Sequence, residues 1–393
     1  MNILVVSSCF APAWSWGGQV RSLWGMCRSL AAAGARVRVV TTDADLHGRI
    51  RVPRQRTDGG LDITTVPIVP GLGTLGSRYA LAPGLPHAVR SGLAGAEIAV
   101  LQGVWTFALL VASRACAARG TPYVVCPRGT LEALSLSEKR RRKSLYLRLA
   151  QGRAIARAAA IQFASDEERR NSAAAALDTA GFVCANAFEF PPLALRDGDG
   201  LRRRLRLPAT AVLVGLAGRL HPRKGFPVIV PALARCDASI HLVAFGADEN
   251  GYRARIEEMA RGAGAAERVH FLGQLEGDAL QGAYAAVDLL AVPSFGESFG
   301  NAVVEALGQG TEVLVSDRVP LGSYVSRAGL GSVVPSMDPG EWARALEDWR
   351  RRERRFDRDR AARAVRADFG PERRGRELLD HYRRIVSEAR AAP

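Results

Sequence analysis

The stretch Asn2-Ile-Leu-Val-Val-Ser-Ser8 opens the chain and, together with the segments after it, decides the fold. A continuous apolar run of this length is typical of a strand buried on both faces of a parallel sheet. A loop with Gly17 and Gly18 comes next, then a segment of helical periodicity over residues 19–33 and a second strand, Arg36-Val-Arg-Val-Val-Thr-Thr42. This strand–helix–strand order predicts a doubly wound α/β domain.

The same pattern continues along the chain and then starts again. Further strands are predicted at 97–101, 122–126, 160–164 and 181–185, and a second series at 211–217, 239–245, 269–272, 288–293, 312–316 and 331–334. Between the series, Pro191, Pro192 and an Asp-Gly-Asp-Gly run are typical of a linker. A chain of 393 residues is also too long for one ordinary core. We therefore predict a first Rossmann-like domain over residues 1–190, a linker over 191–208, a second Rossmann-like domain over 209–368 and a basic helical tail over 369–393.

The composition narrows the classes of function. The formal net charge is +15, which favours an anionic partner such as membrane lipid, nucleic acid or a phosphorylated substrate. A composition biased towards arginine and alanine is an alternative explanation. Nucleic acid is not expected, because no basic platform with interleaved aromatic residues accompanies the charge. The segment Met1 to Ser8 lacks a basic n-region, and no stretch approaches the roughly 20 apolar residues of a membrane span, so we expect a cytoplasmic protein.

Two glycine-rich segments carry the chemistry. The first, Gly215-Leu-Ala-Gly-Arg-Leu-His-Pro-Arg-Lys-Gly225, leads from a predicted strand into a loop with Arg219, Arg223 and Lys224. Glycine permits a close approach of the backbone to a ligand, and the cations can hold a diphosphate. A turn with solvated basic residues is the alternative. The spacing is not that of a P-loop.

The second segment, Pro293-Ser-Phe-Gly-Glu-Ser-Phe-Gly-Asn301, links a predicted strand to a helix that starts near Asn301. The N–H groups at a helix N-terminus form an anion-binding site. Glu297 precedes this helix and can accept hydrogen bonds from sugar hydroxyls. Glu305 lies about one turn into the helix, where a carboxylate can accept hydrogen bonds from two ribose hydroxyls.

Both segments resemble glycosyltransferase family 4. Glu297 and Glu305 match its E-x7-E motif, and the stretch Gly215 to Gly225 is similar to its donor-phosphate segment. The resemblance covers essentially the whole chain and is nearest to a subset of bacterial polysaccharide and lipopolysaccharide assembly enzymes. It implies a GT-B fold, with two Rossmann-like doubly wound domains, a cleft between them and a C-terminal helix that returns to the N-terminal domain. It also implies a retaining glycosyltransferase that uses a nucleotide-diphosphate sugar.

The resemblance assigns roles to individual residues. Arg219 and Lys224 neutralise the donor diphosphate, and Glu297 binds the donor sugar. The residues implied in the rest of the donor site are Phe299, Gly300 and Asn301 for sugar and phosphate, Glu305 for ribose, Gln274 and Leu275 for the nucleobase, and Gly17 and Gly18 for phosphate. No cofactor and no metal are expected. The pairs Asp43/Asp45 and Asp197/Asp199 have DxD spacing, but they lie in polar loops away from these segments.

Two positions depart from the family pattern. Gln102, in Leu101-Gln102-Gly103-Val104-Trp105, stands where many relatives carry a histidine. Asn186-Ala187 replaces the Asn-Gly that is usual at the interdomain hinge. In addition, Pro127-Arg128-Gly129-Thr130-Leu131 resembles a segment of the polysaccharide-assembly subset, so Arg128 faces the donor or the acceptor, or is a structural arginine at a strand end.

The expected acceptor is a glycan or a lipid-linked molecule, held by loops over roughly residues 48–86. A basic run from Lys139 to Lys143, followed by apolar residues, predicts an amphipathic helix that binds an anionic surface at the inner membrane face. A solvated helix face is the alternative. Two other functions stay open, a nucleotide-sugar 2-epimerase and a weakly active subunit that needs a partner. The sugar, the nucleotide, the linkage and the oligomeric state are not determined by these motifs.

Overall fold

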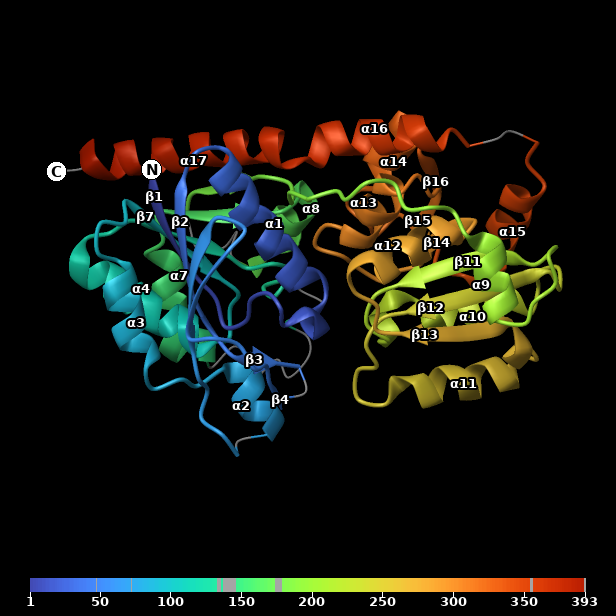
Figure 1. Ribbon diagram of the computed structural model, residues 1–393, viewed down its shortest axis with the longest axis horizontal. Coiled ribbons are helices and arrows are strands. Elements are labelled where there is room, and N and C mark those ends of the chain that lie inside the picture. The colour runs from blue at the N-terminus through green and yellow to red at the C-terminus, as the bar shows by residue number, and fades with distance from the viewer. Residues whose placement is uncertain are drawn as a thin grey trace. The chain divides into compact units, whose positions relative to one another are not determined.

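The computed structural model describes residues 1–46, 48–71, 73–132, 136, 146–173, 179–353 and 356–391 (Figure 1). The chain divides into two compact units. Met1–Glu189 together with Phe369–Pro393 form the first unit, and Phe190–Asp368 form the second. Each unit is a sheet covered by helices, which confirms the predicted pair of Rossmann-like α/β domains.

The first unit is built on a sheet in which all the described strands except β5 run parallel to their neighbours. Among the described residues it has eight strands in the order β10-β9-β8-β7-β1-β2-β6-β5. Their bounds are β1 Asn2–Val6, β2 Arg36–Thr42, β5 Gln55–Asp58, β6 Leu61–Val66, β7 Ile98–Gln102, β8 Tyr123–Cys126, β9 Ala160–Phe163 and β10 Gly181–Val183, and β3 Ala44–Asp45 pairs with β4 Gly48–Arg49 beside it. The chain winds from β1 towards β2 in one direction and from β7 towards β10 in the other. The carboxyl ends of β1 and β7 therefore flank a topological switch point, where open α/β sheets bind their ligands.

The region predicted as acceptor loops, residues 48–86, contains regular structure, so that prediction was wrong in part. β5 and β6 form an antiparallel hairpin at the edge of the sheet. Its turn has Gly59 and Gly60 at φ angles of 56° and 78°, a conformation that glycine adopts without strain. In β6, Leu61 and Ile63 are buried, while Asp62 between them is exposed. The helices α2 Gly73–Tyr79 and α3 Leu85–Gly92 follow.

Helices cover both faces of the first sheet. In β1, Ile3 and Val5 face a core shared with α1 (Gly18–Ala32) and α17 (Pro371–Ala391). Leu4 and Val6 face the other core, and the helices on that side are α3, α4 Phe107–Arg119 and α7 Gly152–Ala156. A short helix, α8 Asp166–Asn171, follows β9. This alternation explains why β1 reads as a continuous apolar run.

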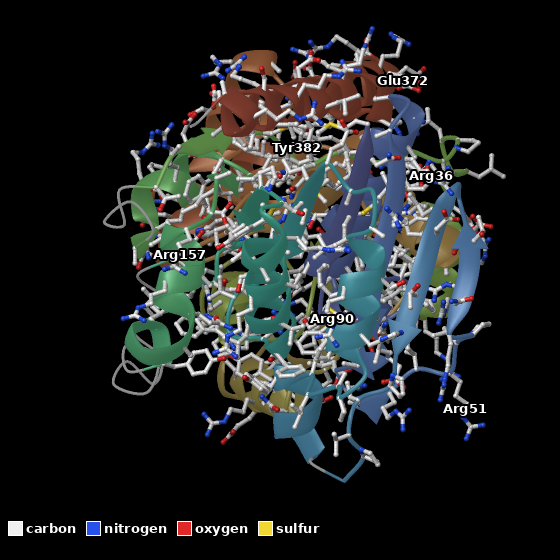
Figure 2. All side chains as sticks on the ribbon, turned by 90° about the vertical axis from the view of Figure 1, so that its left-hand side faces the viewer. Arg36, Arg51, Arg90, Arg157, Glu372 and Tyr382 are labelled. Atoms are coloured by element: carbon white, nitrogen blue, oxygen red, sulfur yellow. The ribbon has the colours of Figure 1, made fainter. Side chains whose placement is uncertain are left out.

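The last helix returns to the first unit, as predicted. α17 packs along α1, and a Cβ on Gly375 would lie only 2.1 Å from the carbonyl oxygen of Ser29. Glycine at this position therefore lets the two helices approach closely. Tyr382 points from α17 into the core, where its hydroxyl donates to Gln162 Oε1 at 2.7 Å (Figure 2).

The second unit repeats the design. Its described strands form a six-stranded parallel sheet in the order β13-β12-β11-β14-β15-β16, with bounds β11 Val212–Ala217, β12 Ile240–Phe245, β13 Val269–Gly273, β14 Leu289–Val292, β15 Val313–Ser316 and β16 Gly331–Val334. Its helices are α9 Gly198–Arg204, α10 Phe226–Leu233, α11 Tyr252–Gly262, α12 Gly277–Ala286, α13 Asn301–Gly308, α14 Gly322–Ala328, α15 Pro339–Arg350 and α16 Arg358–Phe369. The residues predicted as a linker, 191–208, fall within this unit and contain α9. The direction of winding changes between β11 and β14, which is the switch point of this sheet.

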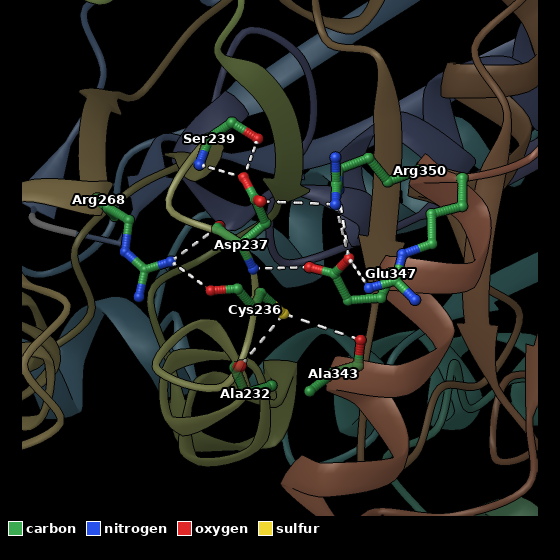
Figure 3. Close-up of polar contacts among 9 residues, drawn as sticks. Ala232, Cys236, Asp237, Ser239, Arg268, Ala343, Glu347 and Arg350 are labelled. Carbon is green, nitrogen blue, oxygen red and sulfur yellow. Dashed lines mark hydrogen bonds and ion pairs between the residues drawn. The ribbon is translucent and has the colours of Figure 1, made fainter.

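A polar network ties together the elements at the amino ends of β12 and β13 (Figure 3). Glu347 on α15 accepts from the backbone N–H of Asp237 at 2.6 Å and pairs with Arg350 at 3.0 Å. Arg268 donates to the carbonyl oxygens of Cys236 and Asp237 at 3.3 and 3.2 Å. These contacts fix the turn before β12 at the edge of the sheet opposite the strand ends that carry the predicted site.

None of the helices in the described part of the chain is both long enough and apolar enough to cross a membrane.

Candidate functional site

The loops that follow β11 and β14 meet at the switch point of the second sheet. β11 and β14 are neighbours, with Gly215 opposite Leu290. Beyond the strands, the N–H of Phe295 donates to the carbonyl oxygen of Arg223 at 2.9 Å. Gly225 has a φ of 86° and caps the N-terminus of α10, and a Cβ there would lie 1.8 Å from the carbonyl oxygen of Pro293. Only glycine fits this contact, so the two motifs found in the sequence are held together by their backbones.

This contact brings two of the predicted catalytic residues into an ion pair. Lys224 Nζ lies 2.6 Å from Glu297 Oε1, and their side chains are only 26% and 17% exposed. The hydroxyl of Ser294 donates to the same carboxylate oxygen at 2.8 Å. Ser294 is itself fixed, because the hydroxyl of Ser316 donates to its carbonyl oxygen at 2.7 Å.

The electrostatics of this pair favour an ionised carboxylate. Burial works to raise the pKa of Glu297, but the charge and hydrogen bond of Lys224 and the hydrogen bond from Ser294 more than offset it. The pKa of Glu297 therefore lies below its usual value. A charged, positioned carboxylate beside an ammonium group can orient sugar hydroxyls while the ammonium contacts an anion.

The third predicted catalytic residue, Arg219, is held by a residue that sequence reasoning missed. Arg219 Nη1 lies 2.6 Å from Glu249 Oε2, and the Glu249 side chain is 9% exposed. Glu249 lies in the loop after β12. That loop packs against the loop after β11, since a Cβ on Gly246 would lie 2.0 Å from the carbonyl oxygen of Gly218. Its position just beyond a predicted strand, at the same edge as Arg219, is a signal that points to it.

We expect Glu249→Gln to raise the KM for the donor about tenfold and to change kcat little. The amide keeps a hydrogen-bond acceptor but removes the charge that fixes the guanidinium, and a charge-assisted hydrogen bond contributes about 1.5–3 kcal/mol. Steady-state kinetics with varied donor measures the effect. The matched control is Glu257→Gln, which breaks an exposed pair with Arg253 on α11. Equal donor KM values in the Glu249 variant and the native enzyme would contradict the role.

The predicted sugar, phosphate and ribose residues lie at the start of α13. Phe299 is buried, and Gly300, at a φ of 105°, caps the helix that begins with Asn301. These residues lie at the positive end of a helix dipole. One turn on, Glu305 Oε2 accepts from the hydroxyl of Tyr284 at 2.6 Å. Tyr284 comes from α12 and is buried, so α12 fixes the orientation of Glu305, a role that no sequence motif indicated.

The predicted nucleobase residues lie further along the same edge. Gln274 and Leu275 follow β13 directly, two strands from β11 in the sheet. Gln274 is exposed, and its side-chain amide donates to Glu276 Oε1 at 2.7 Å. The second unit therefore presents all of its predicted residues at the carboxyl edge of one sheet.

The predicted residues of the first unit lie at the carboxyl edge of its own sheet. Gly17 has a φ of 66° and caps α1, and Gly18 is the first residue of that helix. Arg128 follows β8 with a φ of 52°. Its guanidinium donates to Gln102 Oε1 at 3.2 Å and also to Asn186 Oδ1. Arg128 thus joins Gln102, which departs from the family pattern, to Asn186, whose neighbour Ala187 replaces the usual hinge glycine, within one network.

The loop that carries Arg128 is anchored by a buried acid. The N–H groups of Gly129 and Ala164 both donate to the carboxylate of Glu168, which is 1% exposed. Burial raises the pKa of Glu168, although these hydrogen bonds and the charge of Arg128 act against the rise. Glu168 also belongs to the capped first turn of α8, because its N–H donates to Ser165 Oγ at 3.0 Å. The Arg128 loop is thereby fixed to β9 and α8.

The acidic pairs with DxD spacing make structural contacts. Asp43 pairs with Arg49 at 2.6 Å and accepts from the N–H of Ile68 at 2.9 Å. Asp197 caps α9, where it accepts from the N–H of Gly200 at 2.7 Å. The predicted basic helix around Lys139 to Lys143 lies outside the described residues.

Comparisons with known proteins assign both units. Residues 17–180 match the family model of the glycosyl transferase 4-like domain, and residues 199–366 match that of glycosyl transferases group 1. D-inositol 3-phosphate glycosyltransferase of Salinispora tropica is 35% identical over 209 residues, which cover 48% of this chain and 42% of that protein. The same-named protein of Mycolicibacterium smegmatis is 31% identical over 195 residues, which cover 49% of this chain and 45% of that protein. The chain thus spans less than half the length of these relatives.

Solved structures match nearly the whole chain. Sucrose-phosphate synthase from Thermosynechococcus elongatus superimposes with a TM-score of 0.77 at 20% identity, covering 99% of this chain and 100% of that one. Anabaena HepE in complex with UDP and glucose gives a TM-score of 0.74 at 20% identity, covering 97% and 99%. At this identity the likeness shows the fold. The chain therefore has the GT-B fold and joins a glycosyl transferase 4-like domain to a domain of the glycosyl transferases group 1 family.

Proposed function

We propose that this protein is a retaining glycosyltransferase that moves a sugar from a nucleoside-diphosphate sugar to a glycan or lipid-linked acceptor. The observation that carries the proposal is the juxtaposition of Lys224 with Glu297 at the switch point of the second sheet. Arg219 stands on the same loop, and α13 begins beside it. Cations, a helix N-terminus and a sugar-binding carboxylate together are the groups that a sugar diphosphate requires.

The charge changes during the reaction explain why these groups favour it. As the bond from the anomeric carbon to the phosphate oxygen breaks, negative charge grows on the departing nucleoside diphosphate. Arg219, Lys224 and the N-terminus of α13 are positioned before the reaction, so they stabilise this charge without reorganisation. We propose that these groups serve in place of a divalent metal, and that turnover persists in excess EDTA. The acceptor hydroxyl attacks the anomeric carbon from the same face that the leaving group departs from. An oxygen of the donor phosphate takes the proton of that hydroxyl.

A donor screen tests the proposal. UDP-, GDP- and ADP-sugars are added to the full chain, and the shift of the thermal midpoint is measured, since ligand binding stabilises the folded state by RT ln(1 + [L]/Kd). We expect one nucleotide class to raise the midpoint and Glu305→Ala to reduce that rise. Product analysis then separates a glycoside from a free epimerised sugar. No stabilisation by any of the three classes, or a free isomer as the product, would contradict transfer.

The distribution of charge supports an anionic acceptor or surface. The first unit has 29 lysines and arginines against 16 acids, whereas the second has 25 against 23. Nearly all of the excess positive charge is therefore on the acceptor-side domain. Arg36, Arg51, Arg90 and Arg157 are exposed and project from separate parts of this unit (Figure 2). Each such residue near an anionic membrane contributes about 1 kcal/mol of attraction.

We therefore propose that the enzyme works at the inner membrane face in cell-surface polysaccharide or lipopolysaccharide synthesis. Sedimentation with liposomes tests this: we expect binding to vesicles that contain anionic lipid and weaker binding at high salt. Equal binding to neutral vesicles would remove the membrane role.

The D-inositol 3-phosphate glycosyltransferases among the relatives point to a second acceptor, D-inositol 3-phosphate, which is also anionic. Transfer assays with this compound and with lipid-linked sugars distinguish the two acceptors.

A further inference from the structure

A cluster of four aromatic side chains lies beyond the carboxyl end of β7 in the first unit. Its members are Tyr79, Trp105, Phe107 and Tyr146, and all four are partly exposed. The ring centroid of Tyr146 lies 6.1 Å from that of Trp105 and 6.3 Å from that of Tyr79, and Tyr79 lies 6.1 Å from Phe107. The hydroxyl of Tyr146 donates to that of Tyr79 at 3.2 Å. The cluster thus combines apolar ring faces with a pair of adjacent hydroxyl groups.

The backbone of Trp105 is strained. Its φ angle is 74°, in the left-handed region that a bulky residue adopts only with strain. Such strain persists where surrounding contacts impose it, and it concentrates at functional sites. The chain turns already at Gly103, two residues earlier, where glycine adopts a φ of 78° without strain. The local sequence therefore gives no reason for a second left-handed residue at Trp105.

A buried glutamine imposes this conformation. Gln151 is 0% exposed, and its Oε1 accepts from the N–H of Trp105 at 2.9 Å. Its amide nitrogen donates to the carbonyl oxygen of Thr106 at 2.8 Å and contacts the hydroxyl of Tyr146 at 3.3 Å. The indole N–H of Trp105 donates to the carbonyl oxygen of Thr130 at 3.2 Å. The backbone N–H and the indole N–H of Trp105 are therefore both hydrogen-bonded, and Gln151 connects Tyr146 to the same network.

The position of the cluster is that of a ligand site. β7 and β1 flank the switch point of the first sheet, and the loop after β7 lies against the start of α1, since a Cβ on Gly103 would lie 3.4 Å from the side-chain amide nitrogen of Gln19. Aromatic faces with a few polar groups at a switch point are typical of sites for small organic ligands.

We propose that the cluster of Tyr79, Trp105, Phe107 and Tyr146 binds a sugar ring of the acceptor, so that the acceptor is a glycan and not a simple phosphorylated polyol. A pyranose ring has an apolar C–H face that stacks on an aromatic ring and a rim of hydroxyls that matches the tyrosine hydroxyls. The network around Gln151 holds Trp105 in place for this contact. The inference rests on the proposed glycosyltransferase function and names the chemical class of its acceptor.

The test separates acceptor binding from donor chemistry. Octyl glycosides of glucose, galactose, mannose and N-acetylglucosamine are mixed with the full chain, and saturation-transfer NMR records which sugar protons contact the protein. We expect ring C–H signals from at least one glycoside and their loss in Tyr79→Ala and in Trp105→Ala. For that glycoside the acceptor KM rises tenfold or more in both variants. Hydrolysis of the donor without acceptor, and the donor-induced thermal shift, stay unchanged.

Phe182→Ala is the matched control, because Phe182 is another partly exposed aromatic residue of the first unit and stacks on His381 at 4.3 Å, outside the cluster. This variant keeps the glycoside signals. If Trp105→Ala does not fold, the glycoside signals of Tyr79→Ala and Gln151→Leu provide the test of the cluster instead. Binding by none of the four glycosides, or unchanged signals in the cluster variants, overturns the proposal while donor binding still stands. Loss of donor binding by the native chain would instead overturn the proposed function.

Discussion

Replacing Lys224 with alanine lowers kcat for sugar transfer by about 10²–10³-fold, the effect expected when one positioned charge that stabilises the leaving group is removed. The ammonium group of Lys224 lies 2.6 Å from Glu297, so the change acts on both partners. Without Lys224, burial dominates the pKa of Glu297, which then rises from its lowered value. Since the ionised carboxylate is the form proposed to bind the sugar, the acid limb of the pH profile of kcat moves to higher pH. Steady-state assays from about pH 5 to pH 9 measure both effects.

Arg344→Ala is the matched control for this variant. Arg344 belongs to the same unit and pairs with Glu341 on the exposed surface of α15. An exposed pair of this kind contributes about 0–1 kcal/mol, so turnover and stability stay close to those of the native enzyme. Near-normal turnover in Lys224→Ala, with a folded protein by circular dichroism, would show that the charge of Lys224 does not take part.

Gly225→Ala lowers the free energy of unfolding by about 3–5 kcal/mol and abolishes most of the activity. The added Cβ would lie 1.8 Å from the carbonyl oxygen of Pro293, a backbone atom that no change of rotamer can move, and the φ of 86° is itself strained for alanine. Relief of the clash separates the loop after β11 from the loop after β14, and Lys224 then loses its position beside Glu297. Denaturant unfolding followed by intrinsic fluorescence measures the stability.

Gly251→Ala separates strain from steric overlap. Gly251 also caps the N-terminus of a helix, α11, at a φ of 73°, but no heavy atom beyond its chain neighbours lies within 4 Å of a Cβ at this position. Gly251→Ala therefore lowers the free energy of unfolding only by the conformational penalty of about 1–2 kcal/mol for a non-glycine residue in the left-handed region. Similar losses of stability in the two variants would mean that the two loops can separate freely, contrary to their close contact at Gly225 and Pro293.

The elements that the sequence predicted well share a local cause. The buried strands read as continuous apolar runs, and Gly17 and Gly300 are the residues directly before the first residues of α1 and α13. The hairpin of β5 and β6 was missed because it lies at the sheet edge, where β5 is mostly exposed and its residues lack an apolar pattern. Glu249 and Tyr284 were missed for another reason. Each belongs to an element between the two motifs, and only the fold brings it to Arg219 or Glu305.

The sequence by itself determined the two-domain α/β architecture, the loops that carry the residues predicted to bind the donor and the glycines that those loops require. These features depend on residue type, spacing and the periodicity of apolar residues, all of which are local. Only the tertiary structure decided the partners: Lys224 with Glu297, Arg219 with Glu249, Arg128 with Gln102 and Asn186, and Trp105 with Gln151. The partners of these pairs are separated by up to 73 residues along the chain. Their contact is set by the order of strands in each sheet, because parallel strands place the loops that follow them at one edge.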